Sequence, residues 1–129
     1  MPIDYSILIP TLNEELYIEA CILSLVKNND LINHCEILVI DGGSHDRTLE
    51  IVESLKKKYS NINILHNYKK ITPSALNIGV NASKGKYIIR LDAHAEYCKN
   101  YIDKTVHYLD QSDSKVLNIG GDIVTKNKK

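Results

Sequence analysis

Short apolar runs alternate along the chain with longer segments in which apolar residues recur three and four positions apart. The first pattern is typical of strands covered on both faces, and the second is typical of amphipathic helices. The predicted strands are Tyr5–Ile9, Glu36–Ile40, Ile62–Leu65, Tyr87–Leu91 and Val116–Val124. The predicted helices are Leu16–Lys27, a segment that has Ser44 as its N-cap and ends near Tyr59, Ser74–Ala82 and Asn100–Leu109.

The alternation of strands and helices predicts an α/β fold, in which helices flank both faces of a mostly parallel sheet. Thr72 and Pro73 support the start of the third helix, because a capping hydroxyl followed by proline favours a first helical turn. Pro10 is expected to end the first strand, because proline has no N–H to donate to a sheet ladder. No repeat or internal linker interrupts the pattern, so residues 1–129 are predicted to form a single domain.

Composition narrows the choice of partners and compartment. The formal net charge is zero and the pI is about 7.0, so the chain lacks the basic character expected of a nucleic-acid-binding protein. The three cysteines show no CxxC spacing, which fits reduced thiols better than a disulfide framework. We therefore expect a cytoplasmic protein, and membrane association stays open for a longer native chain.

Two aspartates mark the candidate site. Asp41 and Asp92 each follow a predicted strand, and His94 lies two residues after the second of them. The carboxyl ends of parallel strands share one edge of a sheet, so both aspartates are expected at a single site for a metal or a polar ligand. The alternative is that each aspartate only caps or orients its own loop. Gly42-Gly43 is followed by neither a P-loop lysine nor a GxGxxG pattern, which argues against the usual NTPase and dinucleotide sites.

Four short blocks of sequence carry a resemblance to a known family. The blocks are Ser6–Glu14 with Pro-x-x-Asn-Glu, Val39–Thr48 with Asp-Gly-Gly-Ser-x-Asp-x-Thr, Ala75–Gly79 with Ala-x-Asn-x-Gly, and Gly85–His94 with Asp-Ala-His. In this order they resemble the N-terminal, nucleotide-sugar-binding part of inverting family 2 glycosyltransferases, which have the Rossmann-like GT-A fold. The Asp-Ala-His triplet is similar to that of bacterial exopolysaccharide transferases of the succinoglycan-biosynthesis type.

The resemblance implies roles for particular residues. It assigns nucleotide binding to Pro10, Thr11, Glu14, Asp41, Asn77 and Asp92, and metal binding to Asp92 and His94. Asp41 would accept a hydrogen bond from the base, typically uracil, and Asp92 would face the ribose and diphosphate. A bound Mn²⁺ or Mg²⁺ would stabilise charge on the departing nucleotide. His94 stands where the family has a second carboxylate, and imidazole suits Mn²⁺ better than Mg²⁺; the alternative is a loop histidine bonded to the backbone.

The sequence also departs from the family pattern. Leu76 occupies a position where the family often has arginine, so a cationic contact to the phosphates is expected to be missing there. Lys69 and Lys70 precede the third helix and either meet a diphosphate or lie in a solvated turn. The general base of inverting transfer comes from the second half of the family's catalytic domain, so we expect it outside this chain. Asp122 is a weak alternative.

These features predict the donor-binding part of a transferase, truncated at its C-terminus. The enzyme would move a sugar from a nucleotide-diphosphate sugar, such as a UDP-sugar, to a glycan or lipid-linked acceptor. The alternative is a nucleotide-binding or interaction module that has no transfer activity of its own. The surface that the remaining part would cover is expected to be apolar, so self-association through it is a further hypothesis.

Overall fold

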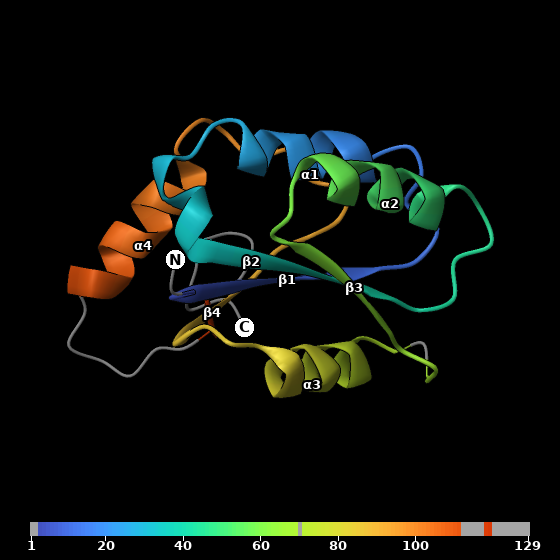
Figure 1. Cartoon of the computed structure of the whole chain (residues 1–129). Coiled ribbons are helices and arrows are strands. Elements are labelled where there is room, and N and C mark those ends of the chain that lie inside the picture. Colours follow the sequence, from blue (N-terminus) through green and yellow to red (C-terminus); the bar gives the residue numbers. More distant parts are fainter. Residues whose placement is uncertain (1–2, 70, 112–117, 120–129) are drawn as a thin grey trace.

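The structure is a computed structural model, and it describes residues 3–69, 71–111 and 118–119 (Figure 1). The strands are β1 (Tyr5–Thr11), β2 (Cys35–Asp41), β3 (Ile62–His66), β4 (Tyr87–Arg90) and β5 (Asn118–Ile119). The helices are α1 (Ile18–Val26), the short 3-10 helix η1 (Asp30–His34), α2 (Thr48–Lys58), α3 (Thr72–Ala82) and α4 (Tyr101–Gln111). Within these residues, no helix has the length and apolar character needed to cross a membrane.

The strands form one parallel sheet in the order β3-β2-β1-β4-β5. The predicted α/β fold is therefore confirmed. The chain moves outward from β1 to β2 and β3, then returns to place β4 on the opposite side of β1. In sheets of this kind, ligands bind outside the carboxyl ends of the strands at the point where the order reverses. Here that point lies between β1 and β4.

The prediction that Pro10 ends the first strand was wrong. β1 continues to Thr11, and Pro10 pairs in register with Ile40 of β2. Backbone groups of successive residues in a strand point to alternate sides, and the Leu8 carbonyl accepts a hydrogen bond from Leu91 on the β4 side. Pro10 comes two residues after Leu8, so its backbone nitrogen, which carries no hydrogen, also faces the β4 side. The pairing of β1 with β4 has already ended there, at Leu8 and Arg90. Pairing with β2 is carried by the neighbouring residues and does not need that donor.

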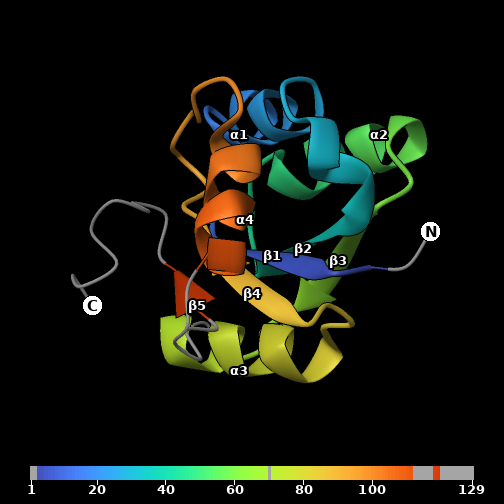
Figure 2. The same cartoon turned by 90° about the vertical axis from the view of Figure 1, so that its left-hand side faces the viewer.

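Alternating residues of the strands build two apolar cores on opposite faces of the sheet (Figures 1 and 2). Helices α1, α2 and α4 cover one face, and α3 covers the other. The larger core joins Ile7, Ile9, Ile37, Val39, Ile89 and Leu91 to Ile18, Ile22, Leu25, Val52, Ile102 and Val106. The smaller core joins Leu8, Leu38 and Ile40 to Ala75, with Leu76 packed against it. Burial of both strand faces explains why the strands are continuous apolar runs.

The start of α2 differs from the prediction. Ser44 is not its N-cap, because α2 begins at Thr48 and the Ser44 hydroxyl donates to Asp41. Asp46 accepts hydrogen bonds from the Thr48 amide and hydroxyl and so satisfies a free donor of the first turn. Helix α1 also begins two residues later than predicted, at Ile18, and Leu16 before it is 79% exposed.

A buried carboxylate fixes the segment that leads into β4. Glu36 of β2 is 5% exposed, and its Oε2 accepts hydrogen bonds from the Ser6 hydroxyl and the Lys84 amide, each at 2.6 Å. The Ser6 hydroxyl oxygen in turn accepts the Gly85 amide at 2.8 Å. The entry to β4 is therefore held against β1 and β2, and this sets the register that brings Asp92 to the sheet edge.

Substitution of Gly85 by alanine is expected to destabilise the protein by about 1–3 kcal/mol, the usual cost of overpacking. A Cβ at this position would lie 2.7 Å from the Ser6 backbone nitrogen and from its hydroxyl oxygen. Urea unfolding measures the change. The control is Gly79→Ala, where the Cβ would meet methyl ends of Leu8 and Ile40 at 2.9 Å, which can move. Equal losses in the two variants would contradict the proposed close backbone approach at Gly85.

Candidate functional site

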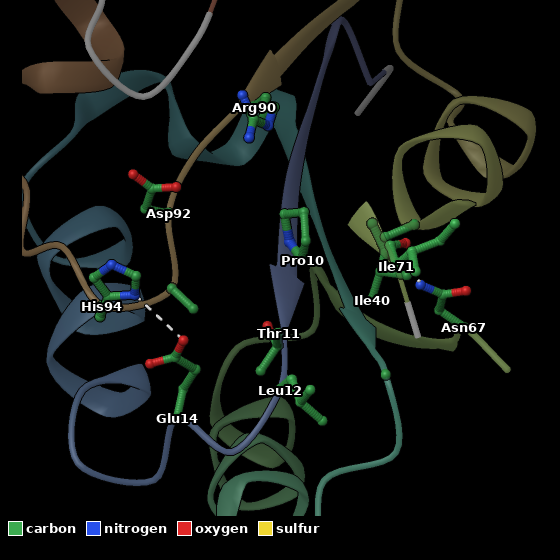
Figure 3. Close-up of a pocket in the computed structure, with 13 residues that line it drawn as sticks. Pro10, Thr11, Leu12, Glu14, Ile40, Asn67, Ile71, Arg90, Asp92 and His94 are labelled. Carbon is green, nitrogen blue, oxygen red and sulfur yellow. Dashed lines mark hydrogen bonds and ion pairs between the residues drawn. The ribbon is translucent and has the colours of Figure 1, made fainter. Parts of the chain in front are cut away.

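A cavity of about 240 Å³ opens at the carboxyl ends of β1, β2 and β4, at the point where the strand order reverses (Figure 3). It is lined by Pro10, Thr11, Leu12, Glu14, Ile40, Gly42, Asn67, Ile71, Ala75, Arg90, Asp92, Ala93 and His94. Residues from β4 and its following loop form one side, and Ile40, Asn67 and Ile71 form the other, with Pro10 and Thr11 between them (Figure 3). The cavity thus has a charged side and a mainly apolar side.

Five of the residues predicted for the site line this cavity: Pro10, Thr11, Glu14, Asp92 and His94. Pro10 and Thr11 are the last two residues of β1, so the strand itself delivers them. The Thr11 hydroxyl donates to the Ile9 carbonyl, so its polar atom is already used within the protein.

Glu14 and His94 are 80 positions apart in the chain and meet at the cavity. His94 Nδ1 lies 3.2 Å from Glu14 Oε2, and the Glu14 side chain is 20% exposed while that of His94 is 63% exposed. His94 therefore contacts a side chain, whereas the alternative prediction was a hydrogen bond to the backbone. A carboxylate at one ring nitrogen orients the imidazole and leaves Nε2 directed away from that contact.

The backbone of Asp92 is held from the protein side. Its amide donates to the Tyr97 hydroxyl at 2.8 Å, and its carbonyl accepts a hydrogen bond from the Cys21 thiol at 3.4 Å. Burial raises the pKa of Cys21 to about 12 and the pKa of Tyr97 above its ordinary value, so both groups stay protonated. Asp92 is exposed and lines the cavity, and no described residue forms a hydrogen bond or ion pair with its carboxylate.

The side chains at the cavity can supply only some of the ligands that a metal ion requires. Within the described residues, no three histidine, cysteine or acidic side chains lie close enough to hold a metal ion by themselves. Asp92 and His94 do line the same cavity, and a carboxylate with an imidazole is a donor set that Mn²⁺ accepts. The remaining ligands would then come from a bound ligand, such as the oxygens of a diphosphate.

Asp41 hydrogen-bonds to its own loop, and the contact to the base that the resemblance implied stays a prediction. It is 1% exposed and is not among the residues that line the cavity. Its Oδ2 accepts the amides of Gly43 and Ser44, each at 2.8 Å, and its Oδ1 accepts the Ser44 hydroxyl. The carboxylate therefore shapes the loop that contributes Gly42 to the cavity, which is the loop-orienting alternative. Asn77, on α3, is exposed and also lies outside the cavity lining.

Reciprocal hydrogen bonds join the loop after β1 to the loop after β2. Asn13 donates its amide to the Ser44 hydroxyl and accepts the His45 amide at its side-chain oxygen. The Glu14 amide donates to the Thr48 hydroxyl at 2.8 Å. The same pattern joins the next pair, in which the Glu15 amide donates to Asp46 and the Arg47 amide donates to Glu15. The first two sequence blocks thus bind to each other, and this pairing sets the position of the Glu14 carboxylate.

The Asp46→Ala variant is expected to be less stable than the wild type near neutral pH and to lose this difference in acid. Partial desolvation raises the pKa of Asp46, but hydrogen bonds from Thr48 and from the Glu15 amide outweigh it, so the pKa lies below its ordinary value. Because the folded-state pKa is depressed, the stabilisation is complete above the unfolded value of about 3.9 and is lost as the pH falls through the folded value.

Urea unfolding of the Asp46→Ala variant and the wild type at about pH 6 and about pH 3 tests this pH dependence. Asp30→Ala is the control, since Asp30 is an exposed carboxylate remote from these loops. A stability difference for Asp46→Ala that stays constant over this pH range would contradict the role of the ionised carboxylate.

Sequence reasoning missed three notable residues of the cavity: Arg90, Asn67 and Ile71. Arg90 did carry a signal, because it is the one charged residue inside the apolar run of β4. Asn67 and Ile71 had none, since they reach the cavity only through the turn between β3 and α3. Lys69 is exposed and does not line the cavity, while Lys70 and Asp122 lie outside the described residues.

Known proteins resemble this chain in sequence over most of its length. Residues 6–126 match the family described as Glycosyl transferase family 2. A curated protein of Methanococcus voltae, named dolichyl N-acetyl-alpha-D-glucosaminyl phosphate 3-beta-D-2,3-diacetamido-2,3-dideoxy-beta-D-glucuronosyltransferase, is 36% identical over 122 residues, which are 90% of this chain and 38% of that protein. The succinoglycan biosynthesis protein ExoA of Rhizobium meliloti is 36% identical over 102 residues, or 78% of this chain and 31% of that protein. The chain thus spans well under half the length of these relatives.

Solved structures share the fold. TarS of S. aureus (residues 1–349), in complex with UDP, superposes with a TM-score of 0.73 at 24% identity, covering 84% of this chain and 32% of that one. Glucosyl-3-phosphoglycerate synthase of Mycobacterium tuberculosis, in complex with Mn²⁺, UDP and glucosyl-3-phosphoglycerate, gives a TM-score of 0.69 at 21% identity, covering 85% and 40%. The predicted GT-A-like arrangement is therefore confirmed at the level of the fold.

Proposed function

Because the chain belongs to glycosyl transferase family 2, we propose that its cavity binds the nucleotide of a nucleotide-diphosphate sugar, with UDP as the preferred nucleotide. The observation that carries the proposal is the meeting of Glu14, Asp92 and His94 at the reversal point of the sheet, beside the apolar wall that begins at Pro10. One cavity thus offers an apolar surface for a flat base and ionisable groups for a metal-bound diphosphate.

The apolar side of the cavity suits the base. Pro10, Ile40 and Ile71 present carbon surfaces that a uracil ring can cover, and such contact contributes affinity without defining the base. Selectivity for one base over another requires hydrogen-bonding groups at defined positions. The loop shaped by Asp41 supplies the backbone of Gly42 at the lining, so in this proposal Asp41 acts on the base through the loop geometry as well as through any direct contact.

The charged side suits the diphosphate. Asp92 and His94 would hold a divalent ion, with Mn²⁺ favoured over Mg²⁺ because one donor is an imidazole. When bound, the ion supplies Lewis-acid stabilisation of the negative charge that develops on the departing nucleotide. Glu14 orients the His94 ring through Nδ1, and Tyr97 and Cys21 fix the backbone from which Asp92 extends.

For the whole protein we propose transfer of the sugar, with inversion, to a glycan or lipid-linked acceptor in the cytoplasm. The curated relatives named above are a glucuronosyltransferase and a succinoglycan biosynthesis protein, which supports a glycan-building role. Inverting transfer needs a general base that deprotonates the acceptor hydroxyl. None of the described residues in the cavity is assigned to this step, and in this proposal the base lies outside residues 1–129.

Calorimetric titration of UDP into the protein tests the donor site, first with Mn²⁺ and then with EDTA, and with GDP and CDP as controls. We expect tighter binding of UDP in the presence of Mn²⁺ and weaker binding of the other two nucleotides. Binding of none of the three nucleotides would overturn the proposal. Equal affinity for all three would remove the assignment of UDP.

A further inference from the structure

The cavity contains one cationic side chain whose partner the structure does not show. Among the described residues that line the cavity, Arg90 is the only lysine or arginine, and it is half-buried. Its Nε is closed off from solvent and has no hydrogen-bond partner within the described residues. Buried donors in native proteins are nearly always paired, so an unpaired one at a cavity wall calls for an explanation.

The position of Arg90 in the sheet makes its charge unusual. It pairs in register with Leu8 of β1 and lies on the face of the sheet that α3 covers, where the neighbouring strand residues are apolar. Helix α3 has no lysine or arginine, and its Leu76 packs against the smaller core. Arg90 does not form an ion pair with any acidic residue that the structure describes.

The charges around Arg90 indicate which class of ligand its cation would bind. Glu14 and Asp92 place two carboxylates at the same cavity, and these repel a diphosphate unless cations offset them. Arg90 and Asp92 are two residues apart at the end of β4, so their Cα atoms are separated by about 7 Å if the chain stays extended. Arg90 and Asp92 lie along the same side of the cavity (Figure 3). An arginine side chain is long enough to span that distance and so to contact a phosphate group bound near Asp92.

Resting on the function proposed above, we propose that Arg90 binds the diphosphate of the donor nucleotide, with a change of side-chain rotamer that brings its Nε–H and a terminal N–H to the phosphate oxygens. The planar guanidinium matches two phosphate oxygens at once, which a single ammonium group does not. Arg90 thereby provides the cationic phosphate contact that Leu76 lacks. It distinguishes a nucleoside diphosphate from a nucleoside, whereas the apolar side of the cavity accepts both.

The test compares UDP with uridine on the same variants. In Arg90→Gln we expect the affinity for UDP with Mn²⁺, measured by calorimetry, to fall by about tenfold or more, as expected for loss of a charge-assisted pair. The affinity for uridine, followed by NMR shifts without metal, should stay within about twofold. Arg90→Lys should lose less, because it keeps the charge. Arg47→Gln is the matched control, since Arg47 is the other arginine of the chain, is exposed and lies outside the cavity lining.

A measurement on the wild type covers the case in which the Arg90 variants fold poorly. The Nε–H resonance of Arg90 should shift on addition of UDP and of inorganic pyrophosphate with Mg²⁺, and should not shift with uridine. Unchanged UDP affinity in Arg90→Gln, or equal losses for UDP and uridine, would overturn the assignment of Arg90 alone. Absence of UDP binding to the wild type would instead overturn the donor site itself.

Discussion

Asp92→Asn is expected to weaken UDP binding in the presence of Mn²⁺ by on the order of 100-fold, and to have little effect when EDTA is present. Asp92 is the only carboxylate of the cavity at the carboxyl end of β4, and its backbone is fixed by Tyr97 and Cys21. Loss of an indirect partner of a metal typically costs about 10–100-fold in affinity, and a direct ligand belongs at the upper end of that range. Titration calorimetry under the two conditions measures the difference.

His94→Ala is the companion variant for this prediction. It should also remove the part of UDP binding that depends on Mn²⁺, while binding in EDTA persists. Thr105→Ser serves as a control for the fold, because Thr105 is buried in α4, away from the cavity. If Asp92→Asn and His94→Ala weaken binding equally with and without metal, the two side chains do not hold the ion.

Asp41→Ala is expected to destabilise the protein by about 2–4 kcal/mol, because hydrogen bonds to a charged group contribute about 1.5–3 kcal/mol and the variant leaves buried donors unpaired. The carboxylate is 1% exposed and accepts two amides and one hydroxyl from the Gly43–Ser44 loop. UDP affinity should fall to the same extent with Mn²⁺ and with EDTA, since Asp41 acts on the loop and not on the metal. Urea unfolding and calorimetry give the two values.

Ser44→Ala separates the parts of the Asp41 interaction. It removes the hydroxyl that donates to Oδ1 and accepts the Asn13 amide, and it keeps both amide bonds to Asp41, so a loss of about 1–2 kcal/mol is expected. A stability of Asp41→Ala within about 0.5 kcal/mol of the wild type would mean that the loop does not depend on the carboxylate. Its main role would then be the direct contact to the base that the resemblance implied.

The fold could be predicted because each of its signals is local. The apolar run Ile37–Ile40 indicated a strand covered on both faces, and every residue of β2 is buried. The errors occurred where a local rule met a longer-range contact. Pro10 remains in β1 because its missing N–H faces the side on which β4 has ended. Ser44 looked like a helix cap, but Asp41 takes its hydroxyl and Asp46 satisfies the first turn instead.

The site could be predicted only in part, because some of its contacts depend on residues far apart in the chain. Asp92 and His94 were predicted from the end of a strand, and Pro10 and Thr11 from the family resemblance, and all four line the cavity. Asp41 was predicted from the end of a strand as well, but it does not line the cavity. The Glu14–His94 contact could not be foreseen from spacing, because the loops after β1 and β4 meet only through the parallel pairing of those strands. The placement of metal and nucleotide on these residues stays a prediction, as do self-association and the identity of the acceptor.

Nucleotide and metal are expected to bind together in the cavity between β1 and β4. Amide NMR signals of the isotope-labelled protein, recorded with Mn²⁺ alone and with Mn²⁺ and UDP, test this joint binding, since the paramagnetic ion broadens nearby signals. Joint binding predicts UDP-dependent broadening at Leu12, Ala93 and His94, and sharp signals at Lys57 of α2. Broadening centred on α2, or broadening that does not depend on UDP, would contradict it.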